Sequence, residues 1–277
     1  MTKQVTSREY KLMLNTSRFQ NRQKGLKAFW GVVKYVVNKT RDAQNVKIKI
    51  KTQDLKQPFQ ERLTWYIDTT PGKDFYAAGW VLRMREEENG ERKEFKTTLK
   101  YRSPDYFISV SKNLSVRDTV EEGLPKFEED VVPAFCSKFS HSTSVETDTI
   151  YQFKKVGDVA ELFPGIIELQ LADDIKTHKV NDFTAHEVVY RVGKFTIGKG
   201  HDKIKIKCCF SFWYLTGKEE TYPLAVEFSF DYDRPEEDDF PLHVCEAAKC
   251  IFSALQKQSS WVDLGGTTKT AFAYTSF

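Results

Sequence analysis

Two arginines separated by one residue are the most informative chemical feature of this sequence. Arg83 and Arg85 lie in a stretch expected to form a strand over residues 78–86, so both side chains point to the same face. In a second basic stretch, Lys96 and Lys100 also share a face. Buried cations cost free energy unless an anion or acidic residues accompany them. If the sheet closes, the pattern therefore predicts a phosphate-binding barrel interior.

These basic residues also have plainer interpretations. Arg83 and Arg85 are compatible with a surface pair bonded to the glutamates at 86–88 or 91, and Lys96 and Lys100 with an exposed strand face. Lys205 lies among alternating lysines at 203–207, which fit either a second wall of the barrel interior or a solvated face. Lys269, at the start of an expected final strand, has the same two alternatives.

Composition supports a folded β-rich protein. The chain has 277 residues, 40% hydrophobic and 14% aromatic, which is enough to bury a core and argues against disorder. No apolar run is long enough for a transmembrane helix, and the N-terminus lacks the apolar core of a signal peptide, so a cytoplasmic location is expected. The five cysteines have no metal-binding or disulfide spacing and are expected to be idle thiols.

Charge is distributed unevenly along the chain. The first 115 residues carry a net charge of +12 and the remainder −9, which gives the overall +3. The two halves should attract each other if they pack together, although uneven surface charge explains the same numbers.

Periodicity predicts many strands and few helices. The expected strands are 7–14, 47–51, 62–68, 78–86, 92–101, 149–155, 165–172, 182–190, 194–197, 203–214, 224–231 and 269–274. The expected helices are 21–39, 115–122, 128–139 and 240–258, with a hairpin turn at 86–90 and loops at 140–144 and 234–239. This pattern predicts a mainly β (α+β) fold, a closed antiparallel barrel with flanking helices. We expect one domain over residues 1–277, with an unplaced insertion at about 103–160.

An ordered set of four N-terminal motifs resembles the CYTH, or triphosphate tunnel metalloenzyme, superfamily. The set comprises Glu-x-Lys on the first strand, then, after a helix, Tyr-x-Asp-Thr at 66–69, Gly-x-x-Leu-Arg-x-Arg at 79–85 and Thr-Leu-Lys at 98–100. The resemblance covers the first hundred residues well and the C-terminal half loosely. It implies an eight-stranded antiparallel tunnel in which basic residues hold a triphosphate and acids at one side hold divalent metal.

Carried onto this chain, the resemblance implies roles for single residues. Glu9 and Glu227 resemble catalytic, metal-binding acids, and Asp231 shares the face of Glu227 as a further metal candidate. The implied triphosphate ligands are Lys11, Arg83, Arg85 and Lys100. Asp68 is expected to cap the turn before Pro71, and Glu187 is an additional candidate for the acidic wall.

One departure from the family pattern affects the metal site. Ser7 stands where the motif has its first acid, and a serine hydroxyl is a poor ligand for a hard divalent ion. Magnesium or manganese is therefore an expected cofactor whose site has lost one ligand.

Four functions fit these residues. The first is metal-dependent hydrolysis of a nucleotide, inorganic or thiamine triphosphate, and the second is binding of a polyphosphate, nucleotide or RNA 5′ end without turnover. Nucleotidyl cyclase activity is the third, and a β-rich nucleic-acid-binding protein is the fourth. The expected partner is a triphosphate or polyphosphate anion, with nucleic acid entering only through a 5′-triphosphate end and no membrane contact. The sequence leaves the oligomeric state open.

Overall fold

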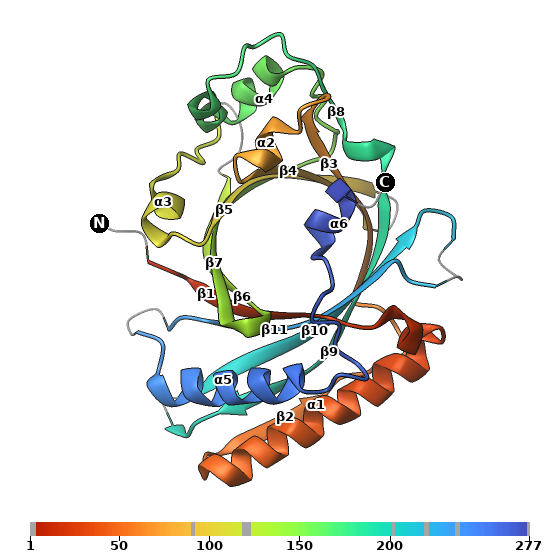
Figure 1. The fold of residues 1–277 in the computed structure, drawn as a ribbon, viewed down its shortest axis with the longest axis vertical. Coiled ribbons are helices and arrows are strands. Elements are labelled where there is room, and N and C mark those ends of the chain that lie inside the picture. The colour runs from red at the N-terminus through yellow and green to blue at the C-terminus, as the bar shows by residue number, and fades with distance from the viewer. Residues whose placement is uncertain are drawn as a thin grey trace.

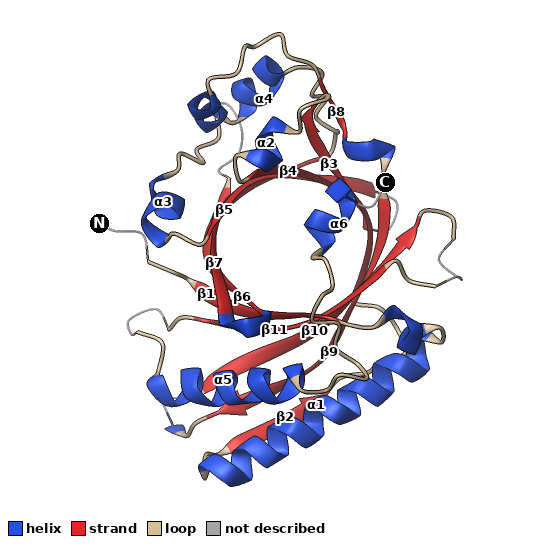
Figure 2. Cartoon of the chain, viewed as in Figure 1, coloured by secondary structure: helices blue, strands red, loops and turns tan. Residues whose placement is uncertain are grey.

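Strands in one continuous sheet dominate the structure (Figures 1 and 2). The computed structural model describes residues 4–89, 92–117, 123–200, 203–218, 222–235 and 239–275. The strands within them are β1 Ser7–Met13, β2 Ile48–Thr52, β3 Gln60–Thr69, β4 Trp80–Asn89, β5 Arg92–Ser103, β6 Leu124–Val132, β7 Cys136–Thr147, β8 Thr177–Lys179, β9 Ala185–Ile197, β10 Ile204–Leu215 and β11 Ala225–Asp233.

Nine of these described strands close into a barrel. Their order is β9-β10-β11-β1-β6-β7-β5-β4-β3, and β3 returns to pair with β9. The closed barrel expected from the sequence is confirmed. It differs from the implied eight-stranded antiparallel tunnel in its strand count and in one pairing, because β1 and β6 run parallel.

The helices α1 Arg22–Gln44 and α5 Leu242–Gln256 cover one outer side of the barrel (Figure 1). Their apolar residues recur at three- and four-residue steps and pack on the outward-facing residues of β9, β10, β11 and β1. Asn21 caps α1 by accepting a hydrogen bond from the Lys24 N–H, and Asn45 ends it in the left-handed conformation. Both helices were predicted from the sequence. No helix among the described residues is long and apolar enough to cross a membrane.

A second apolar core lies on the outer face of β3–β5, beneath the short helices α2 Asp74–Ala77 and α4 Val156–Leu162. Asp68, at the end of β3, fixes the turn into α2. Its buried carboxylate accepts hydrogen bonds from the backbone N–H groups of Thr69, Phe75 and Tyr76 at 2.7–3.0 Å. The predicted capping role of Asp68 is confirmed.

The segment around 103–160 differs most from expectation. The predicted helix 128–139 and loop 140–144 lie instead in β6 and β7, with a 3-10 turn between them, and both strands belong to the barrel. The short helix α3 Tyr106–Ser111 lies outside the barrel (Figure 1), and β6 runs parallel to β1. Residues 115–117 of the predicted helix 115–122 are not helical, and 118–122 lie outside the described residues.

Three predicted strands were wrong. The stretches 149–155 and 165–172 form loops and a 3-10 helix, apart from a single β-bridge at Lys155. The predicted hairpin does join β4 to β5, which pair in antiparallel fashion as far as Asn89 and Arg92, but residues 86–89 belong to β4 rather than to the turn, and residue 90 lies outside the described residues. The final segment is the helix α6 Lys269–Thr275 rather than a strand. The short apolar pattern of this segment fits the two-residue period of a strand as well as the 3.6-residue period of a helix. The Thr268 hydroxyl accepts a hydrogen bond from the Ala271 N–H, which favours a helical start.

Strand β9 changes partner part-way along its length. Residues 185–189 pair with β3 and close the barrel, whereas residues 193–197 pair with the edge strand β2. A bulge separates the two halves, because the register against β10 shifts between Cys208 and Cys209. Gly193 is required there, since a Cβ atom would lie 2.4 Å from the Lys51 carbonyl oxygen. The sheet therefore continues beyond the barrel as an open extension.

Candidate functional site

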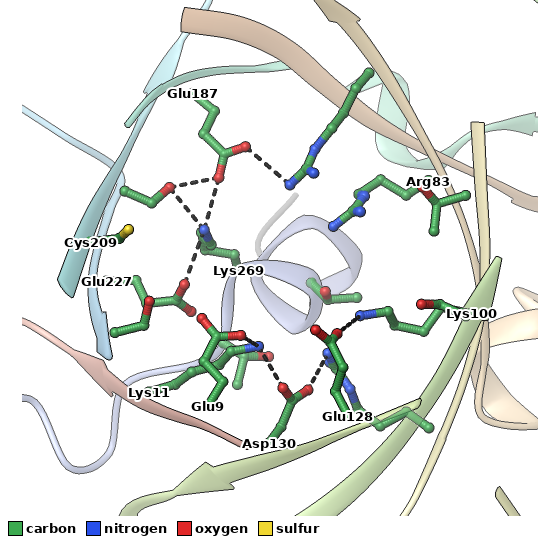
Figure 3. Close-up of a pocket in the computed structure, with 18 of the residues that line it drawn as sticks. Glu9, Lys11, Arg83, Lys100, Glu128, Asp130, Glu187, Cys209, Glu227 and Lys269 are labelled. Atoms are coloured by element: carbon green, nitrogen blue, oxygen red, sulfur yellow. Dashed lines mark hydrogen bonds and ion pairs between the residues drawn. The ribbon is translucent and has the colours of Figure 1, made fainter. Parts of the chain in front are cut away.

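The barrel encloses a cavity of about 390 Å³ with a strongly charged lining (Figure 3). Among the described residues, ten lysine and arginine side chains and six carboxylates line it, an excess of four positive charges. The carboxylates are Glu9, Glu128, Asp130, Glu187, Glu227 and Asp231. All the sequence-predicted site residues contribute to this lining except Lys205, which is exposed on the part of β10 beyond the barrel.

Arg83 and Arg85 project into the cavity from β4, while Leu82 and Met84 pack in the outer core. The only carboxylate that pairs with either arginine among the described residues is Glu187, 3.3 Å from Arg85. The Nε atoms of Arg83 and Arg85 are buried, and neither has a hydrogen-bond acceptor among the described residues. Burial lowers the pKa of both guanidinium groups, and the nearby positive charge of Arg62 lowers both further. Because arginine stays protonated in proteins, the lowered pKa marks a pair of buried cations short of negative charge.

Lys100 on β5 has a similar shortage. Its nearest carboxylate is Glu128, at 3.9 Å. Burial, followed by the positive charge of Arg102, lowers the pKa of Lys100 to about 7. Lys96, four positions back on the same face, is less buried and pairs with the exposed Glu146 at 2.6 Å. Lys100, like Arg83 and Arg85, is therefore a cation with little negative charge nearby, whereas Lys96 lies at the edge of this group.

The acidic side chains of β1 and β11 lie on the side of the cavity opposite Arg83 and Arg85, which we call the arginine wall. Glu9 is in register with Asp231 and forms an ion pair with Lys11 at 2.9 Å. Burial, followed by the negative charge of Glu9, raises the pKa of Asp231 to about 6. Glu227 forms an ion pair with Lys269 at 3.1 Å. Glu9 and Asp231 are thus two carboxylates directly opposite each other, each with one lysine within ion-pair distance among the described residues.

This pair suits a hard divalent cation only in part. Magnesium is commonly held by one or two carboxylates together with phosphate oxygens of a substrate, which Glu9 and Asp231 match. No group of three or more acidic, histidine or cysteine side chains among the described residues is arranged to hold a metal. Ser7 donates a hydrogen bond to Glu128 on the neighbouring strand at 3.2 Å, so a carboxylate does lie beside the position of the missing acid.

Glu128 and Asp130 were missed by the sequence analysis, because 128–139 was predicted as a helix. They alternate on β6 with the buried, outward-facing Phe127 and Val131, and this period of two was the available signal. Asp130 lies 2.8 Å from both Lys11 and Arg102. These cations outweigh the effect of burial and hold the pKa of Asp130 below its usual range.

Glu187 connects the arginine wall to the C-terminal helix. Its almost fully buried carboxylate contacts Arg62 at 2.6 Å, Lys269 at 2.8 Å and, more distantly, Arg85. Ser211 donates a further hydrogen bond at 2.6 Å. These cations hold the pKa of Glu187 well below its usual range despite its burial. The sequence suggested Glu187 for the acidic wall, but the structure places Glu187 among cations. The sequence analysis did not identify Arg62, which also lines the cavity.

Helix α6 projects into one end of the barrel (Figure 1). Lys269 is its first residue and lines the cavity, although the segment is a helix and not the predicted strand. The far end is anchored by Lys73 and Asn181, which donate hydrogen bonds to the carbonyl oxygens of Tyr274 and Ala273 at 2.7 and 2.8 Å. The helix thus narrows one mouth of the tunnel.

No protein-family model matches the sequence, and no curated protein matches it. Among solved structures, the chain is similar to a Hippeastrum protein provisionally assigned as an adenylyl cyclase and described as having a dominant triphosphatase activity (14% identity, 98% of this chain, 96% of that chain, TM-score 0.43). It is also similar to a provisional adenylate cyclase from Bacillus halodurans (12% identity, 98% and 99%, TM-score 0.40). At these identities and TM-scores, the activities of those proteins do not transfer to this chain.

Proposed function

We propose that this chain is a CYTH-type tunnel protein that binds a triphosphate group inside its barrel and hydrolyses it with the help of a divalent metal. The observation that supports this function is the wall formed by Arg83, Arg85 and Lys100. These three cations are largely buried in the lining of the cavity, and Glu187 and Glu128 are the only carboxylates within ion-pair distance of them among the described residues. A polyanion supplies the missing negative charge.

The wall has the chemistry for phosphate. Guanidinium groups bind phosphate oxygens through two parallel hydrogen bonds, and the free Nε donors of Arg83 and Arg85 are available for such contacts. Inside a barrel, where little water competes, these contacts are stronger than at a surface. Arg83 and Arg85 would orient the phosphates, and Lys100 would neutralise charge that develops on them.

Magnesium or manganese would be held by Glu9 and Asp231, with the substrate phosphates as further ligands. When bound, such an ion polarises the phosphoryl group and promotes ionisation of a bound water. Glu227 would join this site only by leaving Lys269, its ion-pair partner at 3.1 Å. The residues of the chain itself bind the anion, orient it and exclude bulk water.

A second function, binding without turnover, is favoured by one observation. The proposed metal site has few protein ligands, because Ser7 stands where the family motif has an acid and no group of three metal-binding side chains occurs among the described residues. A protein of this kind would bind triphosphates equally well after chelation of metal.

The test is incubation of the purified protein with tripolyphosphate, ATP, GTP and thiamine triphosphate, with magnesium or manganese and with a chelator. Phosphate, pyrophosphate and cyclic nucleotide are quantified for wild type, for Arg83→Ala/Arg85→Ala and for the surface control Lys39→Ala/Arg41→Ala. Metal-dependent phosphate release that only the tunnel variant loses supports hydrolysis. Cyclic nucleotide would assign a cyclase instead, and tight binding with no product would assign the binding function.

A further inference from the structure

The open extension of the sheet carries a cluster of lysines outside the tunnel. Lys49 and Lys51 on β2, Lys194 on β9 and Lys205 on β10 lie on the face opposite to the apolar residues that pack under α1 and α5. We call these four residues the lysine ramp. Three of them are exposed and Lys194 is half-buried. The ramp includes Lys205, for which the sequence left both a tunnel wall and a solvated face open.

The register of the strands makes the ramp unusual. Lys51 is directly opposite Lys194, which is directly opposite Lys207, so three lysines form one row across β2, β9 and β10. Like charges placed directly opposite each other destabilise a sheet. Lys207 is compensated by Asp233 at 2.7 Å and Asp231 at 3.6 Å. In the part of the chain that the structure describes, no carboxylate forms an ion pair with the four ramp lysines.

The ramp is continuous with the tunnel. The row of Lys51, Lys194 and Lys207 continues in register to Asp231 and Glu9, which line the cavity. An anion leaving the tunnel past the expected metal site would therefore meet the ramp next.

An aromatic platform lies where the barrel ends and the ramp begins. Arg191 follows the cavity-lining Val189 on the same strand and precedes the bulge. Its guanidinium lies 3.3 Å from the ring centroid of Phe59, and Phe59 is 51% exposed. Exposed arginine and aromatic planes are the groups on which unpaired bases stack.

We propose that the lysine ramp binds the backbone of a single-stranded nucleic acid whose 5′-triphosphate occupies the tunnel, with a base stacked at Arg191 and Phe59. This inference rests on the proposed function and names its substrate class. Lys49 and Lys51, two positions apart on β2, are spaced roughly 7 Å apart, whereas Lys51 and Lys194 face each other across neighbouring strands at roughly 5 Å. Charges at these spacings can meet the phosphates of a flexible single strand or of inorganic polyphosphate alike. The exposed platform of Arg191 and Phe59 favours the nucleic acid. The platform has no use for an inorganic chain.

The test compares three proteins by fluorescence anisotropy and competition at low and moderate salt. The ramp variant is Lys49→Gln/Lys51→Gln/Lys194→Gln/Lys205→Gln. The matched control, Lys24→Gln/Lys27→Gln/Lys39→Gln/Lys257→Gln, removes four exposed lysines on or next to the helices that cover the other side of the sheet. The probes are tripolyphosphate, long-chain polyphosphate, and single-stranded RNA of roughly 12 nucleotides, within the usual site size, bearing a 5′-triphosphate or a 5′-hydroxyl.

The ramp variant is expected to bind both RNAs at least tenfold more weakly than wild type, with tripolyphosphate affinity changed less than twofold. Its salt dependence for RNA should fall by about three in the slope of log K against log salt, for four lost phosphate contacts. The control should match wild type. Unchanged RNA binding, a loss confined to long-chain polyphosphate, or an equal loss of tripolyphosphate would each overturn the proposal. Ramp-dependent RNA binding by a wild type that does not bind tripolyphosphate would support the ramp and overturn only the tunnel function.

Discussion

Glu9 lies directly opposite Asp231 across the β1–β11 ladder, and the two carboxylates share one side of the tunnel. Burial together with the negative charge of Glu9 raises the pKa of Asp231 to about 6. Lys207 is the only cation within ion-pair distance of Asp231 among the described residues, and it also pairs with Asp233. The pair is therefore a concentration of negative charge that the free protein keeps at a cost in stability.

Replacing Asp231 by asparagine should stabilise the free protein at high pH. The carboxyl pKa is 3.8 in the unfolded chain and about 6 in the folded protein, so wild-type stability falls between these values as pH rises. The Asp231→Asn side chain does not titrate, so the stability of the variant does not fall over this pH range. The free energy of unfolding of the variant should exceed that of wild type by on the order of 1–2 kcal/mol at pH 8, after allowance for partial exposure, and the difference should vanish near pH 4.

Urea unfolding at the two pH values measures this difference, with Asp233→Asn as the control because its carboxylate is 64% exposed. A variant that is less stable than wild type at pH 8 would show that Asp231 is not strained by Glu9. Saturating manganese should remove the advantage of the variant, because the metal offsets the same charge in wild type.

Binding of tripolyphosphate should draw a proton onto Lys100. With a pKa of about 7, this lysine is mostly neutral at pH 8 in the free protein, and a bound phosphate raises that pKa. Affinity should therefore fall as pH rises above 7. Calorimetry at pH 8 in two buffers of different ionisation enthalpy should detect proton uptake by wild type and almost none by Lys100→Arg, whose side chain is always charged. Equal uptake by both proteins would assign the proton to another group.

Removing the charge of Glu187 should destabilise the barrel. Glu187→Gln leaves Arg62, Arg85 and Lys269 without their shared carboxylate, and loss of one partner from a buried ion pair costs about 3 kcal/mol or more. Tripolyphosphate should restore more stability to this variant than to wild type, because the anion replaces the missing charge.

Urea unfolding with and without tripolyphosphate tests this, with Glu61→Gln as the control. Glu61 is 48% exposed and pairs with His186 on the neighbouring strand, so its loss should change stability by less than about 0.5 kcal/mol. A Glu187→Gln protein as stable as wild type would mean that water already solvates Arg62, Arg85 and Lys269, so that these cations do not depend on the Glu187 carboxylate.

The sequence predicted the residues whose environment depends on local periodicity. Arg83 and Arg85 share a face because strands alternate, and the hydrophobic positions around them are unambiguous. Glu128 and Asp130 were missed because Val131, Val132 and Phe135 recur at three- and four-residue steps that resemble a helix, whereas pairing with β1 and β7 makes the segment a strand. Tertiary pairing overrode the local pattern in this segment.

Contacts between distant segments were not predictable in the same way. Lys269 reaches Glu187 and Glu227 only because α6 projects into the barrel, and no local pattern encodes that path. Lys205 shares an alternating lysine pattern with the cavity strands, but the bulge at Gly193 places that part of the sheet outside the barrel. Closure of the barrel, rather than alternation alone, determines which cations become buried.

The most direct test of the tunnel is calorimetric titration of tripolyphosphate into wild type, Arg83→Gln/Arg85→Gln and the surface control Lys39→Gln/Arg41→Gln, with metal chelated. Wild type and the control should bind one equivalent with the same affinity, and the tunnel variant should bind at least a hundredfold more weakly while remaining folded by circular dichroism. A folded tunnel variant that binds tripolyphosphate as tightly as wild type would contradict the assignment of this cavity as the triphosphate site.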